Sequence, residues 1–377
     1  MKSSKRVVEI LILTLVFATS LFLIWDFFQK QYTYQRFEND TVRYQKGVVT
    51  EVVDQKLQLS EDGGVTGYQN IEVKLRDGET VLIENYITLT HNVVVQKDVE
   101  IIVCVDEPEG VEPYYSVYSY NREKRIGIVL LSFVLLMILI GRTKGIRSAL
   151  GLGFTVSVMV CYMIPRLYEG EKAWKVILIS LTLSALGSCF CIGGFEKKTL
   201  CNIINTMFGG ISAGLIFLIL MKILKLNRGM IELAEELQMI SRSTGMNLHS
   251  IMFAGVMISA LGAVMDVAVT LSSALWEIKK IKKSIIRREM FFAGMDIGKD
   301  MIGTMTNTLI LAFLGGALPT LIVFVSYGVQ YHQFISSDFL VMEMVCGIAG
   351  SMAVILSVPI SAFVCSVFYC SRKECFQ

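Results

Sequence analysis

The residues best suited to chemistry lie in one segment, 294–308, and their spacing places them on one face of a helix. Asp296, Asp300, Gly303 and Asn307 are separated by four, three and four residues, which is the repeat of an α-helix, and Thr304 and Thr308 flank them. The set contains two carboxylates, one amide, two hydroxyls and one glycine. We call it the polar stripe: Asp296, Asp300, Gly303, Thr304, Asn307 and Thr308.

A stripe of this composition can line a path for a cation, a proton or a small polar solute. Carboxylates attract cations, while amide and hydroxyl groups replace the hydrogen bonds that a solute loses on leaving water. Gly303 would let a second helix approach closely. A structural interpretation stays open beside this one. Asp296 would then cap the start of the helix, Lys299 would pair with a neighbouring acid, and the threonines would bond back to their own helix.

A further acidic residue, Asp266, lies within the apolar segment 262–268. Ionisable groups inside a membrane are costly, and no opposite charge lies near Asp266 in the sequence. It therefore faces a partner on another helix, faces a wet cavity, or is protonated. A functional role and a structural hydrogen bond between helices are both compatible with the sequence.

The elements that would position these residues are long apolar runs. The chain has 377 residues, of which 53% are hydrophobic and 18% charged, which favours a membrane protein over a soluble one. A helix needs about 20 apolar residues to cross roughly 30 Å of hydrocarbon. With an N-terminal anchor, the runs predict about eight transmembrane helices. The candidate spans after the anchor are 126–140, 149–164, 174–195, 200–224, 248–275, 301–326 and 339–369.

The anchor is predicted over residues 1–25. Basic residues precede an apolar stretch that is long for a signal peptide, and Trp25 is not followed by a small-residue cleavage site. We therefore expect an uncleaved helix.

Residues 26–125 have a different composition, richer in charged and β-branched residues. Segments 47–53, 71–75 and 80–83 alternate between apolar and polar residues, which is typical of half-buried strands, and 99–105 is predicted as a further strand. About five short strands in this region predict a small Greek-key barrel, similar to an OB fold in size. The predicted domains are thus the anchor 1–25, a β-rich domain 26–125 and a seven-helix region 126–377.

The orientation follows from the short loops, because Lys and Arg are retained on the cytoplasmic side. Loops on the side of the two termini carry roughly twice as many of these residues as loops on the other side. We therefore predict a multi-pass protein of the cell membrane with both termini cytoplasmic and the β-rich domain extracytoplasmic.

Motifs of soluble catalysis are absent from the sequence. There is no phosphate-binding glycine loop, no His-Glu-x-x-His motif and no Ser-His-Asp grouping, and the three histidines are scattered. We expect no enzymatic activity, no metal site and no cofactor. The formal net charge of +2 gives no reason to expect a nucleic-acid partner.

The same polar segments carry a family resemblance. Segments 262–268 and 294–309, together with Gly141-Arg142-Thr143-Lys144-Gly145, resemble the YibE/F-like family of bacterial multi-pass membrane proteins. Lys299 departs from the arginine expected there but keeps the charge. The resemblance extends over nearly the whole chain, the β-rich domain included. It implies a multi-pass membrane fold and singles out the same Asp and Asn residues, without implying a substrate.

The interpretation we favour is an α-helical integral membrane protein that acts as a transporter or channel. Asp266, Asp296, Asp300, Thr304, Asn307 and Thr308 would bind a small solute or an ion. The alternative is a scaffold or sensor that transports nothing and whose β-rich domain recognises a partner. Expected partners are the lipid bilayer, a small solute or ion, and another membrane protein or a second copy of the chain.

Overall fold

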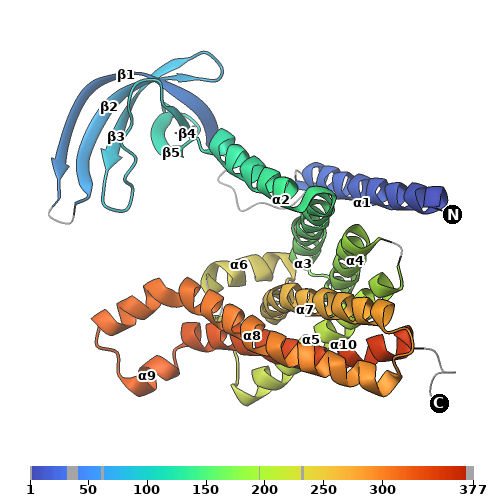
Figure 1. Ribbon diagram of the computed structural model, residues 1–377. Coiled ribbons are helices and arrows are strands. Elements are labelled where there is room, and N and C mark those ends of the chain that lie inside the picture. The colour runs from blue at the N-terminus through green and yellow to red at the C-terminus, as the bar shows by residue number, and fades with distance from the viewer. Residues whose placement is uncertain (1, 32–40, 61–62, 195, 231–232, 371–377) are drawn as a thin grey trace. The chain divides into compact units, whose positions relative to one another are not determined.

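The computed structural model describes residues 2–31, 41–60, 63–194, 196–230 and 233–370. It divides into two compact units (Figure 1). One comprises Thr33–Met137, and the other comprises Met1–Tyr32 with Ile138–Gln377. Each unit is described by itself below. Arg372 and Lys373, two of the basic residues on which the predicted cytoplasmic side rests, lie outside the described residues.

The first unit is built on a five-stranded antiparallel sheet. Its strands are β1 (Val42–Leu59), β2 (Val65–Leu75), β3 (Thr80–Ile87), β4 (Glu100–Asp106) and β5 (Tyr114–Tyr120). Their order across the sheet is β3-β2-β1-β4-β5. The long strand β1 pairs with β4 through its first half and with β2 through most of its length, and its pairing with β2 shifts register twice. Such shifts bend and twist a strand, and the sheet is accordingly curled.

The core of this unit lies on one face of the curled sheet. Alternate residues of the strands point into it, among them the fully buried Val49, Ile71, Val73, Ile101 and Val103. Three of the four predicted strands fall within observed strands, and the fourth, 99–105, is observed one residue later as β4. β5 adds a strand that no particular segment had predicted. Closure into a barrel stays a prediction, although β3 and β5, at opposite edges of the sheet, do contact each other.

The second unit is helical. Its helices longer than ten residues include one that begins in the first unit, α2. They are α1 (Lys2–Gln31), α2 (Glu123–Ser157), α4 (Ala173–Gly193), α5 (Lys197–Ile223), α6 (Ala234–Thr244), α7 (Leu248–Ile281), α8 (Arg287–Ser326) and α10 (Asp338–Tyr369). α2 continues through a π-helical turn (Val158–Met163) into α3 (Ile164–Tyr168), and α9 (Tyr331–Ile335) is a single short turn.

Six helical runs of the described chain are long and apolar enough to cross a membrane, the first being the continuous run Glu123–Tyr168. They suggest a membrane-embedded protein. Two features bear on the expected number of about eight transmembrane helices. α1 contains a shorter apolar stretch, Thr14–Gln29, and α2 has a non-helical residue at Arg142. That residue falls between the predicted spans 126–140 and 149–164, where a loop was expected. The count itself stays a prediction.

α5 contacts α4, α7 and α10. Two adjacent glycines allow these contacts. A Cβ atom on Gly209 would lie 2.2 Å from a methyl group of Val264 in α7, and one on Gly210 would lie 2.5 Å from Leu181 in α4. Small residues let membrane helices pack closely, so this glycine pair fixes the spacing of three helices.

α8 packs along α10, and glycines again set the distance (Figure 1). A Cβ atom on Gly298 would lie 2.1 Å from Val358, and one on Gly294 would lie 2.8 Å from the Cβ of Ala362. Gly294 and Gly298 are one turn apart, as in the small-xxx-small pattern of closely packed membrane helices. α10 continues as a helix through Pro359.

Candidate functional site

The polar stripe lies on the face of α8 that points away from α10. At about 100° per residue, Asn307 is about 180° around the helix from Gly298, which packs on α10. All six residues of the stripe are exposed in the chain. The spacing argument therefore predicted a shared face correctly. That face is turned outward from the helices described.

Part of the structural interpretation is confirmed by the contacts. Lys299 donates a hydrogen bond of 2.9 Å to the Asp296 carboxylate. Thr304 Oγ1 donates to the carbonyl oxygen of Met301 at 3.1 Å, and Thr308 Oγ1 donates to that of Thr304 at 2.9 Å. The other part is wrong. α8 begins at Arg287, so Asp296 lies more than two turns inside the helix and caps nothing.

The polar groups of two members of the stripe have no partner among the described residues. Among the described residues, neither the carboxylate of Asp300 nor the side-chain amide of Asn307 forms a hydrogen bond or an ion pair. They are two turns apart on one exposed face. An anion and an amide held in this way are available to a cation or to a polar solute.

Asp266 lies on α7 at the same depth as the stripe. Its neighbours Ala263 and Val267 pack in a cluster with Met301 and Met305 of α8. The side chain of Asp266 is exposed, and within the described chain its carboxylate also forms no hydrogen bond or ion pair. The structure therefore places Asp266 and the stripe at one level on neighbouring helices. It records no direct contact between them.

The polar character of the outer face of α8 ends at Thr308. Further along the helix, the exposed residues on that side are Leu311, Leu314 and Leu318. The stripe thus covers the part of α8 that follows its N-terminal turns and gives way to an apolar surface.

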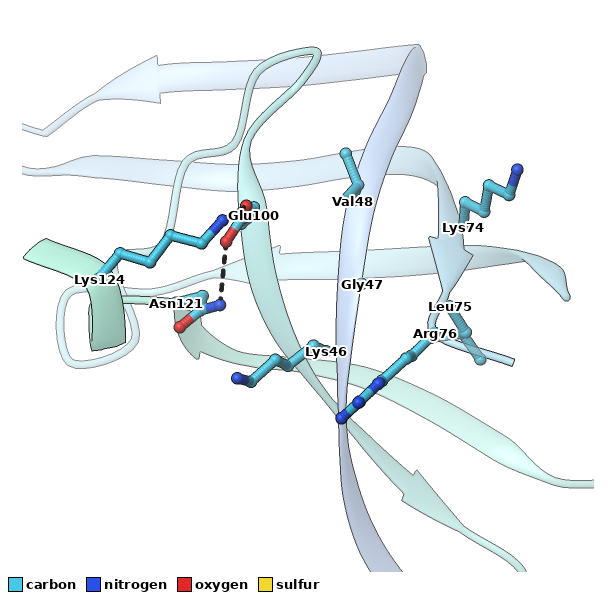
Figure 2. Close-up of a pocket in the computed structure, with 9 residues that line it drawn as sticks. All are labelled: Lys46, Gly47, Val48, Lys74, Leu75, Arg76, Glu100, Asn121 and Lys124. Carbon is cyan, nitrogen blue, oxygen red and sulfur yellow. Dashed lines mark hydrogen bonds and ion pairs between the residues drawn. The ribbon is translucent and has the colours of Figure 1, made fainter. Parts of the chain in front are cut away.

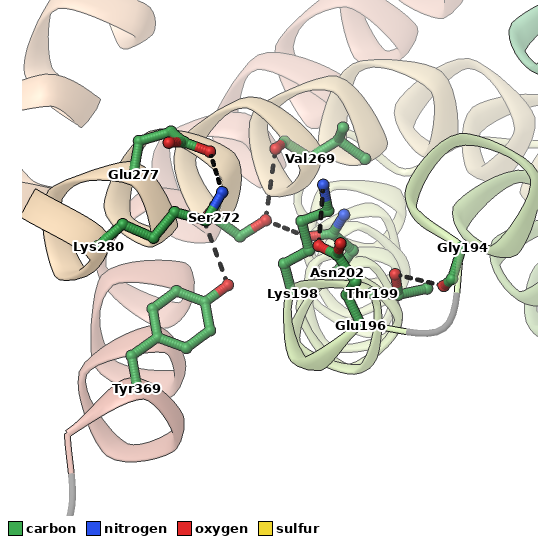
Figure 3. A network of polar contacts seen from close by, with 10 residues as sticks. All are labelled: Gly194, Glu196, Lys198, Thr199, Asn202, Val269, Ser272, Glu277, Lys280 and Tyr369. Carbon is green, nitrogen blue, oxygen red and sulfur yellow. Dashed lines mark hydrogen bonds and ion pairs between the residues drawn. The ribbon is translucent and has the colours of Figure 1, made fainter. Parts of the chain in front are cut away.

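A second polar region, which the sequence analysis did not identify as a site, lies buried between α5, α7 and α10 (Figure 3). Ser272 donates a hydrogen bond to the side-chain oxygen of Asn202, and Tyr369 donates one of 3.2 Å to the carbonyl oxygen of Ser272. All three residues are buried. The sequence signal for this region was an asparagine within an apolar run, Asn202. Its partners could not be identified from the sequence, because they come from helices far apart along the chain.

This buried region continues along α5 toward α4 and α10. Asn205 and Thr206 are completely buried, and the Asn205 amide reaches only the sulfur of Cys365, at 3.8 Å. Four buried side-chain oxygen atoms here have no hydrogen-bond partner in the described residues. They belong to Ser184, Asn205, Thr206 and Ser361. No charged residue is buried in this part of the described chain, and the ion pairs Lys198–Glu196 and Lys280–Glu277 in Figure 3 are partly exposed, so we assign the region to helix packing.

The paired and unpaired serines of this region give a test of that assignment. In Ser272→Ala, the buried Asn202 oxygen loses its donor, which should lower the free energy of unfolding by about 1 to 3 kcal/mol. Ser184→Ala removes an equally buried hydroxyl that has no partner, so it should be neutral or slightly stabilising. Unfolding of the two variants in detergent would be compared with the wild type. Equal losses of stability in both variants would contradict the assignment.

No group of three or more metal-ligating side chains is gathered in the described ranges. The functional groups available are therefore carboxylates, amides and hydroxyls on long apolar helices. Together with the six apolar helical runs, this suggests a membrane protein with polar groups placed along helices long and apolar enough to cross a bilayer.

Comparison with known proteins assigns the family. The model of the YibE/F-like protein family matches residues 129–371, and the chain belongs to that family. The match begins inside α2, so the expectation that the resemblance includes the β-rich domain is not supported by it. Searches of curated proteins and of solved structures found no match.

Proposed function

We propose that this protein transports an ion or a small polar solute across the cell membrane without enzymatic chemistry. One observation supports the proposal most strongly. Asp300 and Asn307 lie on the outer face of a long apolar helix, and neither side chain has a hydrogen-bond or ion-pair partner in the described residues. The other members of the polar stripe and Asp266 would contribute to the same path.

The energetic argument is that such a face cannot be left in contact with lipid. A charged side chain costs roughly 2.5 to 3.5 kcal/mol at the centre of a spanning helix and less near its end, where Asp300 lies, and polar groups within a span usually face water or another helix. The inner face of α8 is occupied by α10, so the outer face needs either water or a further protein surface. A second copy of the chain or another membrane protein would close the path on that side.

The proposed orientation places the stripe near the cytoplasm. With both termini cytoplasmic, α8 begins on the cytoplasmic side, next to a loop rich in Lys and Arg, and the β-rich domain lies outside. The stripe would then form the inner part of the path. The apolar residues Leu311, Leu314 and Leu318 would form its barrier, because apolar constrictions exclude water and ions.

The alternative function is that of a scaffold or sensor. In that case the outer face of α8 would be covered by dry protein contacts, and recognition of a partner would belong to the β-rich domain. Water at the stripe separates the two functions.

Accessibility to a water-soluble reagent tests for that water. Thr304→Cys places a thiol in the stripe, and Met352→Cys places one at a matched depth on α10. The contacts Gly298–Val358 and Gly294–Ala362 show that residues 304 and 352 lie at the same level, and both are exposed. Because a thiol reacts as its thiolate, which forms in water, a charged, membrane-impermeant thiosulfonate should modify Thr304→Cys and spare Met352→Cys.

Labelling would be measured on membranes, with the wild type reporting the background from native cysteines. Equal labelling of the two variants, or none at Thr304→Cys, would favour the dry contacts of a scaffold.

A further inference from the structure

The β-rich unit carries a pocket that is separate from the polar stripe (Figure 2). It has a volume of about 300 Å³ and is lined from the solvent-facing side of the sheet and from the turn that leads into α2. Four cations surround it, Lys46, Lys74, Arg76 and Lys124, against a single lining carboxylate, that of Glu100.

Strand register explains why the cations of the two strands share one face of the sheet. In the pairing of β1 with its two neighbours, Val48 lies opposite both Lys74 and Glu100. Lys46 and Arg76 occupy the next positions on the same face, because side chains alternate along a strand. Lys124 reaches the pocket from the first turn of α2, on the opposite side from Arg76 (Figure 2).

Two of the four cations are already paired. Lys124 binds the Glu100 carboxylate at 2.7 Å, and Lys46 pairs with Glu123. The hydrogen bond from Lys124 holds the pKa of Glu100 below its usual range, so Glu100 is ionised at neutral pH. Neither Lys74 nor Arg76 forms an ion pair in the part of the chain that the structure describes. The pocket therefore keeps a positive excess.

Like charges close together on one face of a sheet destabilise it. A bound anion would remove that cost. The guanidinium of Arg76 suits phosphate because its planar fork donates two parallel hydrogen bonds, and the ammonium of Lys74 adds a point charge. Val48 supplies apolar surface next to these donors.

The pocket is also close to the beginning of an apolar helix. Lys124 lies two residues before Ile126, where the apolar run of α2 begins. At about 1.5 Å per residue, this places the pocket within one helical turn of the start of the apolar run. If the run enters the bilayer, the pocket is at the level of lipid headgroups, where basic and aromatic side chains are commonly found.

We propose that this pocket binds a phosphate group, carried either by an anionic lipid headgroup or by a soluble phosphate, with Arg76 and Lys74 as the principal ligands. The proposal concerns the β-rich unit alone and does not depend on transport.

The test uses full-length protein in a neutral detergent and isothermal titration calorimetry. The probes are a short-chain phosphatidylglycerol, the zwitterionic short-chain phosphatidylcholine, and inorganic phosphate. Arg76→Gln and Lys74→Gln should each weaken phosphatidylglycerol binding by about tenfold or more, as expected for a lost hydrogen bond to a charged group. Arg76→Lys should retain part of the affinity. The control is Lys56→Gln, an exposed lysine of β1 outside the pocket, which should bind as the wild type does.

Loss of inorganic phosphate binding in the same variants would identify the phosphate itself as the recognised group. Binding of phosphatidylglycerol alone would identify a lipid headgroup, and both results support the site. The proposal is overturned if neither probe binds, if Arg76→Gln binds like the wild type, or if Lys56→Gln weakens binding equally. It is also overturned if phosphatidylcholine binds as well as phosphatidylglycerol.

Discussion

Gly298→Leu should destabilise the protein by about 3 kcal/mol, the upper end of the usual cost of overpacking. A Cβ atom at this position would lie 2.1 Å from Val358, so even the first added carbon forces α8 and α10 apart. The change would be measured as the loss of helical circular dichroism on heating in detergent.

The same substitution five residues along α8 provides the control. Gly303 lies on the outer face and has nothing within 4 Å of an added Cβ. Gly303→Leu should therefore change the free energy of unfolding by no more than about 0.5 kcal/mol. In Gly298→Ala, the further change Val358→Ala should restore part of the lost stability, because it removes the clashing methyl groups. Equal losses for the two leucine variants would show that α8 does not pack on α10 as described.

Asp266→Leu should leave the protein as stable as the wild type or more stable. A carboxylate deep in an apolar helix costs roughly 2.5 to 3.5 kcal/mol, and in this chain Asp266 is exposed and has no partner in the described residues to offset that cost. Residues kept for function often lower stability in this way. Unfolding in detergent would be followed for Asp266→Leu and for the near-isosteric Asp266→Asn.

A structural role for Asp266 makes the opposite prediction. If its carboxylate held two helices together by a hydrogen bond, Asp266→Leu would lower stability by about 1 to 2 kcal/mol. Such a loss, smaller in Asp266→Asn, would move Asp266 from the proposed path to the packing of the bundle.

Local patterns in the sequence were enough to predict the elements and one shared face. Alternation along residues 71–75 and 80–83 predicted strands that form, and the spacing of Asp296, Asp300 and Asn307 predicted their common face on α8. Both patterns depend only on the geometry of a single element, which the sequence states directly.

Contacts between elements could not be predicted in this way. The sequence does not say that the face of α8 with Gly294 and Gly298 packs on α10, and this contact is what turns the stripe outward. The hydrogen bonds that join Asn202, Ser272 and Tyr369 likewise connect three helices across long stretches of chain. At Arg142 a single non-helical residue stands between the predicted spans 126–140 and 149–164, where a loop had been expected.

The central claim is that the polar stripe of α8 conducts, and flux through the reconstituted protein tests it most directly. Wild type, Asp300→Asn and Asp296→Asn would be placed in sealed liposomes, and proton and cation flux would be recorded under imposed gradients. We predict flux in the wild type and loss of flux in Asp300→Asn, because the Asp300 carboxylate has no partner in the described residues. Flux should be largely retained in Asp296→Asn, because the Asp296 carboxylate is paired with Lys299. Wild-type flux that is unchanged in Asp300→Asn would contradict the claim.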